Sequence, residues 1–70
     1  MKRWSNKMGA HGGFIENEKI DKFLEEIIAV CRKWGFSISH EDGHGSFEIE
    51  DFLESNAEWL MNATDNTTGT

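Results

Sequence analysis

Hydrophobic residues recur at spacings of three and four between Asn17 and Gly35, which is typical of one apolar stripe along a helix. The members of this stripe are Ile20, Phe23, Leu24, Ile27, Ile28, Cys31 and Trp34. Asn17 is a suitable N-cap, and two acidic residues follow it in the first turn. Two basic residues lie in the last turn, and Gly35 suits the left-handed position that ends many helices. The pattern therefore predicts a helix between Asn17 and Gly35.

After this helix, apolar and polar residues alternate on both sides of Asp42-Gly43, a dipeptide typical of a type I′ hairpin turn. With a two-residue turn, the numbers of opposed residues sum to 85, and one face of the hairpin becomes apolar and is expected to be buried. A one-residue shift would turn the apolar residues outward, so the alternation specifies the register. The expected pairs on the buried face are Phe36 with Ile49, Ile38 with Phe47 and His40 with Gly45.

The remaining segments are shorter. Residues 55–58 (Ser-Asn-Ala-Glu) match a capping box, which predicts a second helix after Ser55 that carries Trp59, Leu60 and Ala63. Residues 1–13 are basic and then glycine-rich and are predicted to be an arm, residues 14–63 a single domain, and residues 64–70 a flexible tail. The fold class is α+β in the order helix, hairpin, helix (αββα), to which residues 14–15 can add an N-terminal strand.

The small size of the chain limits its core. Seventy residues bury only about 60% of their unfolded surface, so such a domain usually needs a disulfide, a metal or self-association. Cys31 is the only cysteine, which excludes an intrachain disulfide and a cysteine-based zinc site. A two-stranded sheet also has two open edges, and the aromatic residues exceed what this core needs. We therefore expect a homo-oligomer.

The charge is unevenly distributed. Three of the seven basic residues lie in residues 1–7, which leaves four basic against 13 acidic residues, a net charge of −9, for the rest. This acidity argues against direct nucleic-acid binding, which usually requires a basic surface. No apolar run is long enough to span a membrane, and the basic start is not followed by the apolar segment of a signal peptide. We expect a cytoplasmic protein with no membrane partner.

The most unusual segment is the run His40-Glu41-Asp42-Gly43-His44-Gly45, which holds two imidazoles, two carboxylates and two glycines. Asp42 and Gly43 are explained by the turn alone. His40 is expected to lie on the buried face opposite Gly45, where the missing side chain would leave a notch beside the imidazole. His40 has an alternative role there, since it can simply hydrogen-bond a helix end.

Catalytic and metal sites have weaker support. His40, His44 and Asp42 could bind a divalent ion with His11, but in a tight hairpin His40 and His44 project to opposite faces, so no metal site is predicted. His44 with Glu41, or His40 with Asp42, could form an acid–base pair. The sequence has no nucleophile elbow, phosphate loop or zinc-protease motif. We therefore predict no catalytic residue and no cofactor, and a hydrolase is the third choice.

Three segments resemble a group of very small, mostly uncharacterised bacteriophage and prophage proteins. These segments are Phe23-Leu24-Glu25-Glu26-Ile27, Cys31-Arg32-Lys33-Trp34-Gly35 and Ser37-Ile38-Ser39-His40-Glu41-Asp42-Gly43-His44-Gly45-Ser46-Phe47. The last one matches the group's signature Ser-x-Ser-His-Glu-Asp-Gly-His-Gly-x-Phe. The resemblance extends from Ile20 to Ala63 and says nothing about the arm or the tail.

The resemblance implies a biological context. Tiny phage proteins are often accessory factors that block host defences, and one class consists of oligomeric sponges that sequester nucleotide-derived immune signals without cleaving them. We infer membership of that class from the small size, the expected self-association and the polar loop. In this hypothesis Trp34 or Trp59 stacks on a base and Arg32 or Lys33 offsets phosphate charge. The predicted ligand-binding residues are His40, Glu41, Asp42, Gly43, His44, Gly45, Arg32 and Trp59.

A second hypothesis explains the acidic composition more directly. An acidic surface with exposed aromatic anchors suits a protein–protein inhibitor that occupies a basic surface of a host defence protein or nucleic-acid-binding protein. The sequence leaves the ligand, the host target and the number of subunits open.

Overall fold

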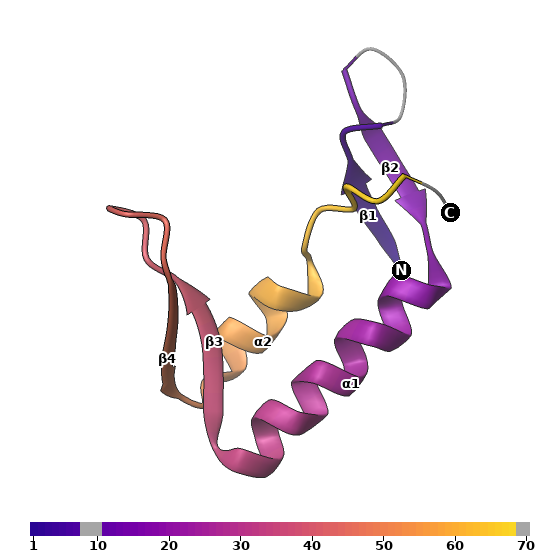
Figure 1. Cartoon of the computed structure of the whole chain (residues 1–70). Helices are drawn as coiled ribbons and strands as arrows, with labels where there is room; N and C mark the ends of the chain where they lie inside the picture. Colours follow the sequence, from indigo (N-terminus) through magenta and orange to yellow (C-terminus); the bar gives the residue numbers. More distant parts are fainter. Residues whose placement is uncertain (8–10, 69–70) are drawn as a thin grey trace.

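The longest element begins and ends where the sequence predicts. In the computed structural model, which describes residues 1–7 and 11–68, α1 spans Glu18–Trp34 (Figure 1). The Asn17 side chain accepts hydrogen bonds from the N–H groups of Lys19 and Ile20, at 3.1 and 3.3 Å. Gly35 has a φ of 75°, and its N–H donates to the Cys31 carbonyl at 2.9 Å. Both ends of this helix are therefore fixed by local signals.

The other elements form two hairpins and a short helix, so the predicted α+β class is confirmed. The elements around α1 are β1 (Lys2–Ser5), β2 (Gly13–Glu16), β3 (Phe36–His40), β4 (Phe47–Asp51) and α2 (Glu54–Met61). β1 pairs with β2 and β3 pairs with β4, both antiparallel, in two separate sheets. The order ββα thus occurs twice. The extra N-terminal strand exists as β2, but it pairs with β1 and does not extend the β3–β4 sheet.

The expected arm and tail belong to the folded unit in the described part of the chain. Ser5 of β1 forms a parallel bridge with Asp65, and the Asp65 N–H donates to the Trp4 carbonyl at 2.8 Å. The C-terminal segment accordingly runs beside β1 in Figure 1, and only 2% of Asp65 is exposed. Residues 8–10 of the expected arm and residues 69–70 of the expected tail lie outside the described residues.

A buried arginine holds these two segments together. Arg3 donates to the carbonyls of Met61 and Ala63, at 2.9 and 3.0 Å, and forms an ion pair with Asp21 of α1 at 2.5 Å. One side chain of β1 therefore contacts the end of α2, the segment after it and α1. Charged groups are buried only when they are paired in this way, so Arg3 is a structural residue.

The register of the β3–β4 hairpin differs from the prediction by two residues. His40 pairs with Phe47, not with Gly45, and Ile38 pairs with Ile49. The turn is longer than Asp42-Gly43, because the Glu41 N–H donates to the Ser46 carbonyl and the Glu41 carbonyl accepts from the Gly45 N–H. Since side chains alternate with a period of two, this even shift leaves the apolar residues together on one face.

The expectation that this apolar face is buried is wrong. Phe47 is 80% exposed and Ile49 is 66% exposed, whereas Ser37 and Ser39 on the opposite face are buried. The hairpin meets the helices along β3, and β4 lies at the outer edge of the molecule in Figure 1. All five residues of β4 are exposed. The helices cover β3 and leave β4 exposed. The alternation of apolar and polar residues does not indicate which face or strand the helices will cover.

α2 begins two residues earlier than predicted and does not use the capping box. Its N-cap is Leu53, which forms no side-chain capping bond. The Leu53 N–H donates instead to the Ser37 hydroxyl of β3 at 2.9 Å. Arg32 of α1 forms an ion pair with Glu54 in the first turn of α2. Contacts from β3 and α1 therefore replace the local cap expected from Ser55.

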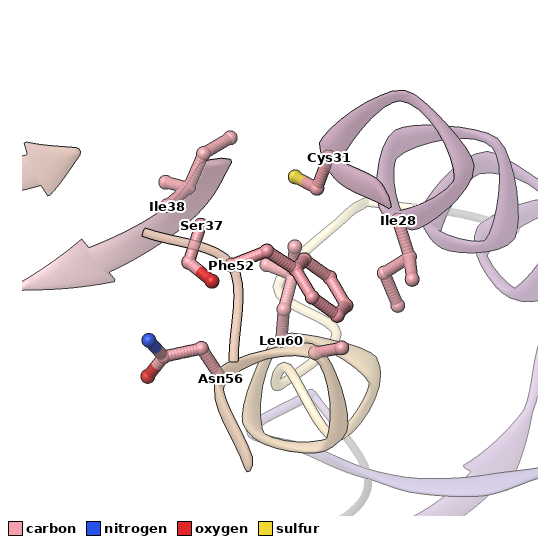
Figure 2. A pocket seen from close by; sticks show the side chains of 8 residues that line it. Ile28, Cys31, Ser37, Ile38, Phe52, Asn56 and Leu60 are labelled. Atoms are coloured by element: carbon pink, nitrogen blue, oxygen red, sulfur yellow. The ribbon is translucent and has the colours of Figure 1, made fainter. Parts of the chain in front are cut away.

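The core lies between α1, β3 and α2. Figure 2 shows side chains from these elements around a cavity of about 10 Å³, including Ile28, Cys31, Ile38 and Leu60. The buried hydrophobic residues in the described part of the chain are Leu24, Cys31 and Ala57. This core is small for 70 residues. No helix within residues 1–7 and 11–68 combines the length and apolar character needed to cross a membrane.

Candidate functional site

The loop after β3 is organised by the Glu41 carboxylate. Its two oxygens accept hydrogen bonds from the backbone N–H groups of Gly43 at 2.5 Å and His44 at 2.6 Å. These two bonds lower the pKa of Glu41 below its ordinary value. A Cβ atom at Gly43 would lie 2.7 Å from a Glu41 oxygen, so a side chain there would displace the carboxylate. The loop is therefore closed around Glu41 and not around the predicted two-residue turn.

The structure brings together both histidine–carboxylate pairs considered from the sequence. His44 Nδ1 lies 3.1 Å from Glu41, and His40 Nδ1 lies 3.6 Å from Asp42. His44 and Asp42 are almost fully exposed, and Glu41 is held ionised by the loop N–H groups. The His44 imidazole is exposed, and the carboxylate beside it has a lowered pKa. This contact is therefore better explained as stabilising the loop than as transferring a proton to a substrate.

The largest feature near the predicted site is a groove between the β3–β4 hairpin and the C-terminal end of α2. Its volume is about 320 Å³, which lies within the range of small-molecule sites. Its walls combine ring side chains with hydroxyl and amide groups. The lining residues are Ile38, Ser39, His40, Phe47, Trp59, Leu60, Asn62, Ala63 and Thr64.

Aromatic rings dominate the two walls of this groove. The His40 and Phe47 rings meet edge to face with their centres 5.9 Å apart. His40 on β3 lies directly opposite Phe47 on β4, because the observed register pairs these two residues. Trp59 of α2 also lines the groove. A planar ligand can therefore contact an imidazole, a phenyl ring and an indole in a single site.

Two of the eight predicted ligand-binding residues, His40 and Trp59, line the groove. The loop residues Glu41, Asp42, Gly43, His44 and Gly45 are not among its lining residues. Gly45 lies at its margin, since a Cβ atom there would be 4.0 Å from His40 Nε2. Arg32 lies elsewhere, bound to Glu54 and with its guanidinium 5.3 Å from the centre of the Phe52 ring. The eight residues predicted to form one site therefore lie in three different places: the groove, the loop and the contact between Arg32 and Glu54.

Sequence reasoning missed Phe47, Asn62 and Thr64 as parts of the groove. Phe47 was expected opposite Ile38, and only the longer loop moves it opposite His40. Asn62 lies three residues after Trp59, which is a helical spacing that could have indicated a shared face. Thr64 fell within the expected tail. The docking of residues 63–65 against Arg3 and β1 holds it beside α2, and that contact has no local sequence signal.

The groove residues are electrically neutral apart from the titratable His40. Among the described residues, the lining of the groove contains no lysine, arginine, aspartate or glutamate. In the described ranges, no three histidine, cysteine or carboxylate side chains form a group that could hold a metal ion. The donor set fits an uncharged ring with polar edges better than a phosphate or a metal.

Known proteins provide no further assignment. No protein-family model, no curated protein and no solved structure matches this chain. The functional conclusion therefore rests on the residues and geometry of the groove.

Proposed function

We propose that this protein is a non-enzymatic binding protein that holds the planar ring of a small ligand in the groove between β3 and α2. The observation that carries this proposal is the convergence of His40, Phe47 and Trp59 on one groove of about 320 Å³. Aromatic side chains stack on flat ligands and contribute about 1–3 kcal/mol per nucleobase. Asn62 and Thr64 supply amide and hydroxyl groups that can bond the polar edge of such a ring, whereas the buried Ser39 hydroxyl already donates to Glu50 at 2.6 Å.

The ligand class that fits best is a nucleotide-derived molecule recognised through its base. The loop N–H groups of Gly43 and His44 are bonded to Glu41 and are therefore not free to bind a phosphate. The described part of the chain also places no lysine or arginine in the groove lining. A phosphate would therefore remain in solvent while the base enters the groove.

The biological role that we propose follows from the resemblance to small phage proteins. In the cytoplasm of an infected bacterium, a self-associating protein of this kind would sequester a nucleotide-derived immune signal and so counter the host defence. Sequestration needs a binding groove and no reacting group. This requirement agrees with a site whose polar lining residues are Ser39, His40, Asn62 and Thr64.

Native mass spectrometry and calorimetry test this proposal. Protein purified from cells is measured before and after mild denaturation, and cyclic di-AMP is then titrated into the purified chain. We expect a nucleotide-like mass to be released. Trp59→Ala should weaken cyclic di-AMP binding about tenfold or more, since it removes one stacking surface. Trp59→Phe should retain most of the affinity.

A matched histidine pair completes this experiment. His40→Ala should weaken binding, whereas His11→Ala, an exposed histidine in the other hairpin, should not. Equal behaviour of all variants, together with no released ligand, would contradict the proposal.

The exposed strand β4 favours one second candidate function. Its sequence Phe47-Glu48-Ile49-Glu50-Asp51 alternates apolar and acidic residues, and its partner among the described strands is β3 alone. An unpaired strand edge can accept a strand from another protein, and the acidic side chains would favour a basic one. An inhibitor of a basic host protein would use this surface.

Affinity capture from host lysate at increasing salt tests this second function. The acidic inhibitor requires one stoichiometric partner whose binding falls steeply with salt. Glu48→Lys should abolish capture, while Glu25→Lys on the exposed face of α1 should leave it nearly unchanged. Capture that is insensitive to both salt and Glu48→Lys would exclude this mechanism.

A further inference from the structure

The apolar face of α1 is wider than the rest of the chain covers. At about 100° per residue, its hydrophobic residues span an arc of about 160°. Leu24 and Cys31 are buried on one half of this arc. The other half holds Phe23, Ile27, Val30 and Trp34, which we call the outer stripe. Phe23 is 59%, Val30 55% and Trp34 66% exposed. In Figure 1, α1 lies along one border of the molecule, with α2 on its inner side.

The surface area of the chain exceeds that of a compact monomer of its mass by about the area that one protein buries in a standard interface. The chain exposes 5365 Å² at a mass of 8.0 kDa. A folded monomer of that mass exposes about 4,450 Å². The excess of about 900 Å² is close to the roughly 800 Å² that each protein buries in a standard interface. The radius of gyration of 13.3 Å likewise exceeds the value of about 11 Å for a compact domain of this length.

The spacing of the outer stripe makes it complementary to itself. Positions 23, 27, 30 and 34 follow steps of four, three and four, which read the same in both directions. We propose that two copies of this chain associate through the outer stripe, with their α1 helices antiparallel about a two-fold axis. Phe23 would then meet the partner's Trp34, and Ile27 would meet the partner's Val30. Closed two-fold dimers use the same patch on both subunits in this way.

Charges beside the outer stripe support the same arrangement. Glu26 and Lys33 flank it on the side away from the core, seven residues apart along α1. In the antiparallel pair, Glu26 and the partner's Lys33 are offset by two residues along the helix axis, a distance of about 3 Å. Each dimer therefore contains two opposite-charge contacts of this kind. Lys33 already borders the stripe, since its Nζ lies 5.7 Å from the centre of the Trp34 ring.

The other open surface is less suitable for a second copy. Antiparallel pairing of two β4 edges about Ile49 would place Glu48 beside Glu50 of the partner subunit. Like charges that face each other across strands are destabilising, and charged residues commonly protect strand edges. Self-association through α1 avoids this repulsion and leaves both β4 and the groove free.

Dimerisation through the outer stripe is the self-association that the proposed function includes. The two can fail separately, because the outer stripe contains no groove residue. The test is the mass of the full chain by analytical ultracentrifugation over a wide concentration range, with helix content checked by circular dichroism. We expect twice the 8.0 kDa chain mass for the unmodified protein. Val30→Glu should give the mass of one chain, while Ala29→Glu, on the exposed polar face of α1, should remain a dimer.

Exchanged charges identify the orientation of the helices. Glu26→Lys and Lys33→Glu should each weaken dimerisation, and the two changes combined should restore it. A monomeric unmodified chain would overturn the proposal and leave the outer stripe to a different protein. A dimer or larger assembly that survives Val30→Glu would overturn it as well, since another surface would hold the copies together. Cyclic di-AMP titration of the Val30→Glu monomer reports on the groove independently.

Discussion

Glu41 shows how a single side chain can set the geometry of a whole hairpin. Its backbone closes the loop through Gly45 and Ser46, while its carboxylate satisfies two further N–H groups within the loop. Together these bonds stabilise a loop that is longer than a two-residue turn at Asp42-Gly43. The same residue thus moves Phe47 opposite His40 and creates one wall of the groove.

The Glu41 carboxylate should make the loop sensitive to acid. Its pKa is lowered below the ordinary 4.5, so its hydrogen bonds are present at neutral pH and are lost as pH falls through the lowered value. We expect the His44 amide resonance to titrate below pH 4.5. Glu41→Gln should abolish this titration and accelerate amide exchange at Gly43 and His44. Asp42→Asn, at an exposed neighbouring carboxylate, is the control. A midpoint at or above 4.5 would contradict the assigned bonds.

Gly45 is the second residue on which the loop depends. Its φ of 72° lies in the left-handed region, which side chains with a Cβ atom rarely adopt. Gly45→Ala should lower the free energy of unfolding by about 1 kcal/mol in urea denaturation. Gly45→Asn should lower it less, because asparagine tolerates this conformation. Equal stability of Gly45→Ala and the unmodified chain would mean that the loop adopts another backbone.

At the scale of elements, predictability depends on whether the determining contact is local. α1 was predicted correctly because Asn17 and Gly35 cap it from positions directly beside it. The alternation in the hairpin correctly predicted which residues share a face of the sheet. The register was predicted incorrectly, because it depends on the hydrogen bonds that Glu41 forms within the loop. The start of α2 was misplaced by two residues because it is stabilised by Ser37, a residue 16 positions away from Leu53.

Two serine-to-alanine variants test this interpretation of α2. Ser37→Ala leaves the Leu53 N–H without its acceptor, so the free energy of unfolding should fall by about 1 kcal/mol. Ser55→Ala should have little effect, because Ser55 is exposed and forms no capping bond. Chemical denaturation of both variants measures the difference. A larger loss for Ser55→Ala would restore the capping box as the signal that starts α2.

At the scale of the whole molecule, the chain is held together by polar contacts between its ends as well as by a small core. Arg3 and Asp65 lie 62 residues apart in sequence, yet both are buried in the cluster that joins β1 to the segment after α2. This cluster and the groove residue Thr64 escaped sequence analysis, because a basic start and a threonine-rich end are typical of solvated segments. The fold class follows from local patterns, whereas the groove residues Ala63 and Thr64 depend on this docking.

The docked segment should add acid sensitivity to the stability of the whole chain. Hydrogen bonds from the Thr67 hydroxyl and N–H lower the pKa of Asp65 below its ordinary 3.8. A carboxylate of lowered pKa contributes stability that is complete above its unfolded value and is lost as pH falls through the folded one. Asp65→Asn should therefore reduce the free energy of unfolding at neutral pH and flatten its decline below about pH 4. Urea denaturation at several pH values measures both effects.

An exposed carboxylate provides the comparison for this variant. Asp51→Asn, at the solvent-facing end of β4, should retain the unmodified pH dependence. If both variants behave alike, Asp65 is not the group that couples stability to pH.

The even shift of the β3–β4 register divides possible changes in the Glu41–Ser46 loop into two classes. An insertion or deletion of two residues keeps every side chain of β4 on its present face, so the Phe47 wall can be refilled by another residue of the same orientation. A change of one residue exchanges the faces and would present Glu48 and Glu50 where Phe47 and Ile49 now lie. Whether a variant of this hairpin keeps an aromatic groove would then depend mainly on whether the loop length changes by an even or an odd number of residues, and less on which residues the loop contains. Loop libraries that seek new ligand preferences on this scaffold should accordingly vary in steps of two.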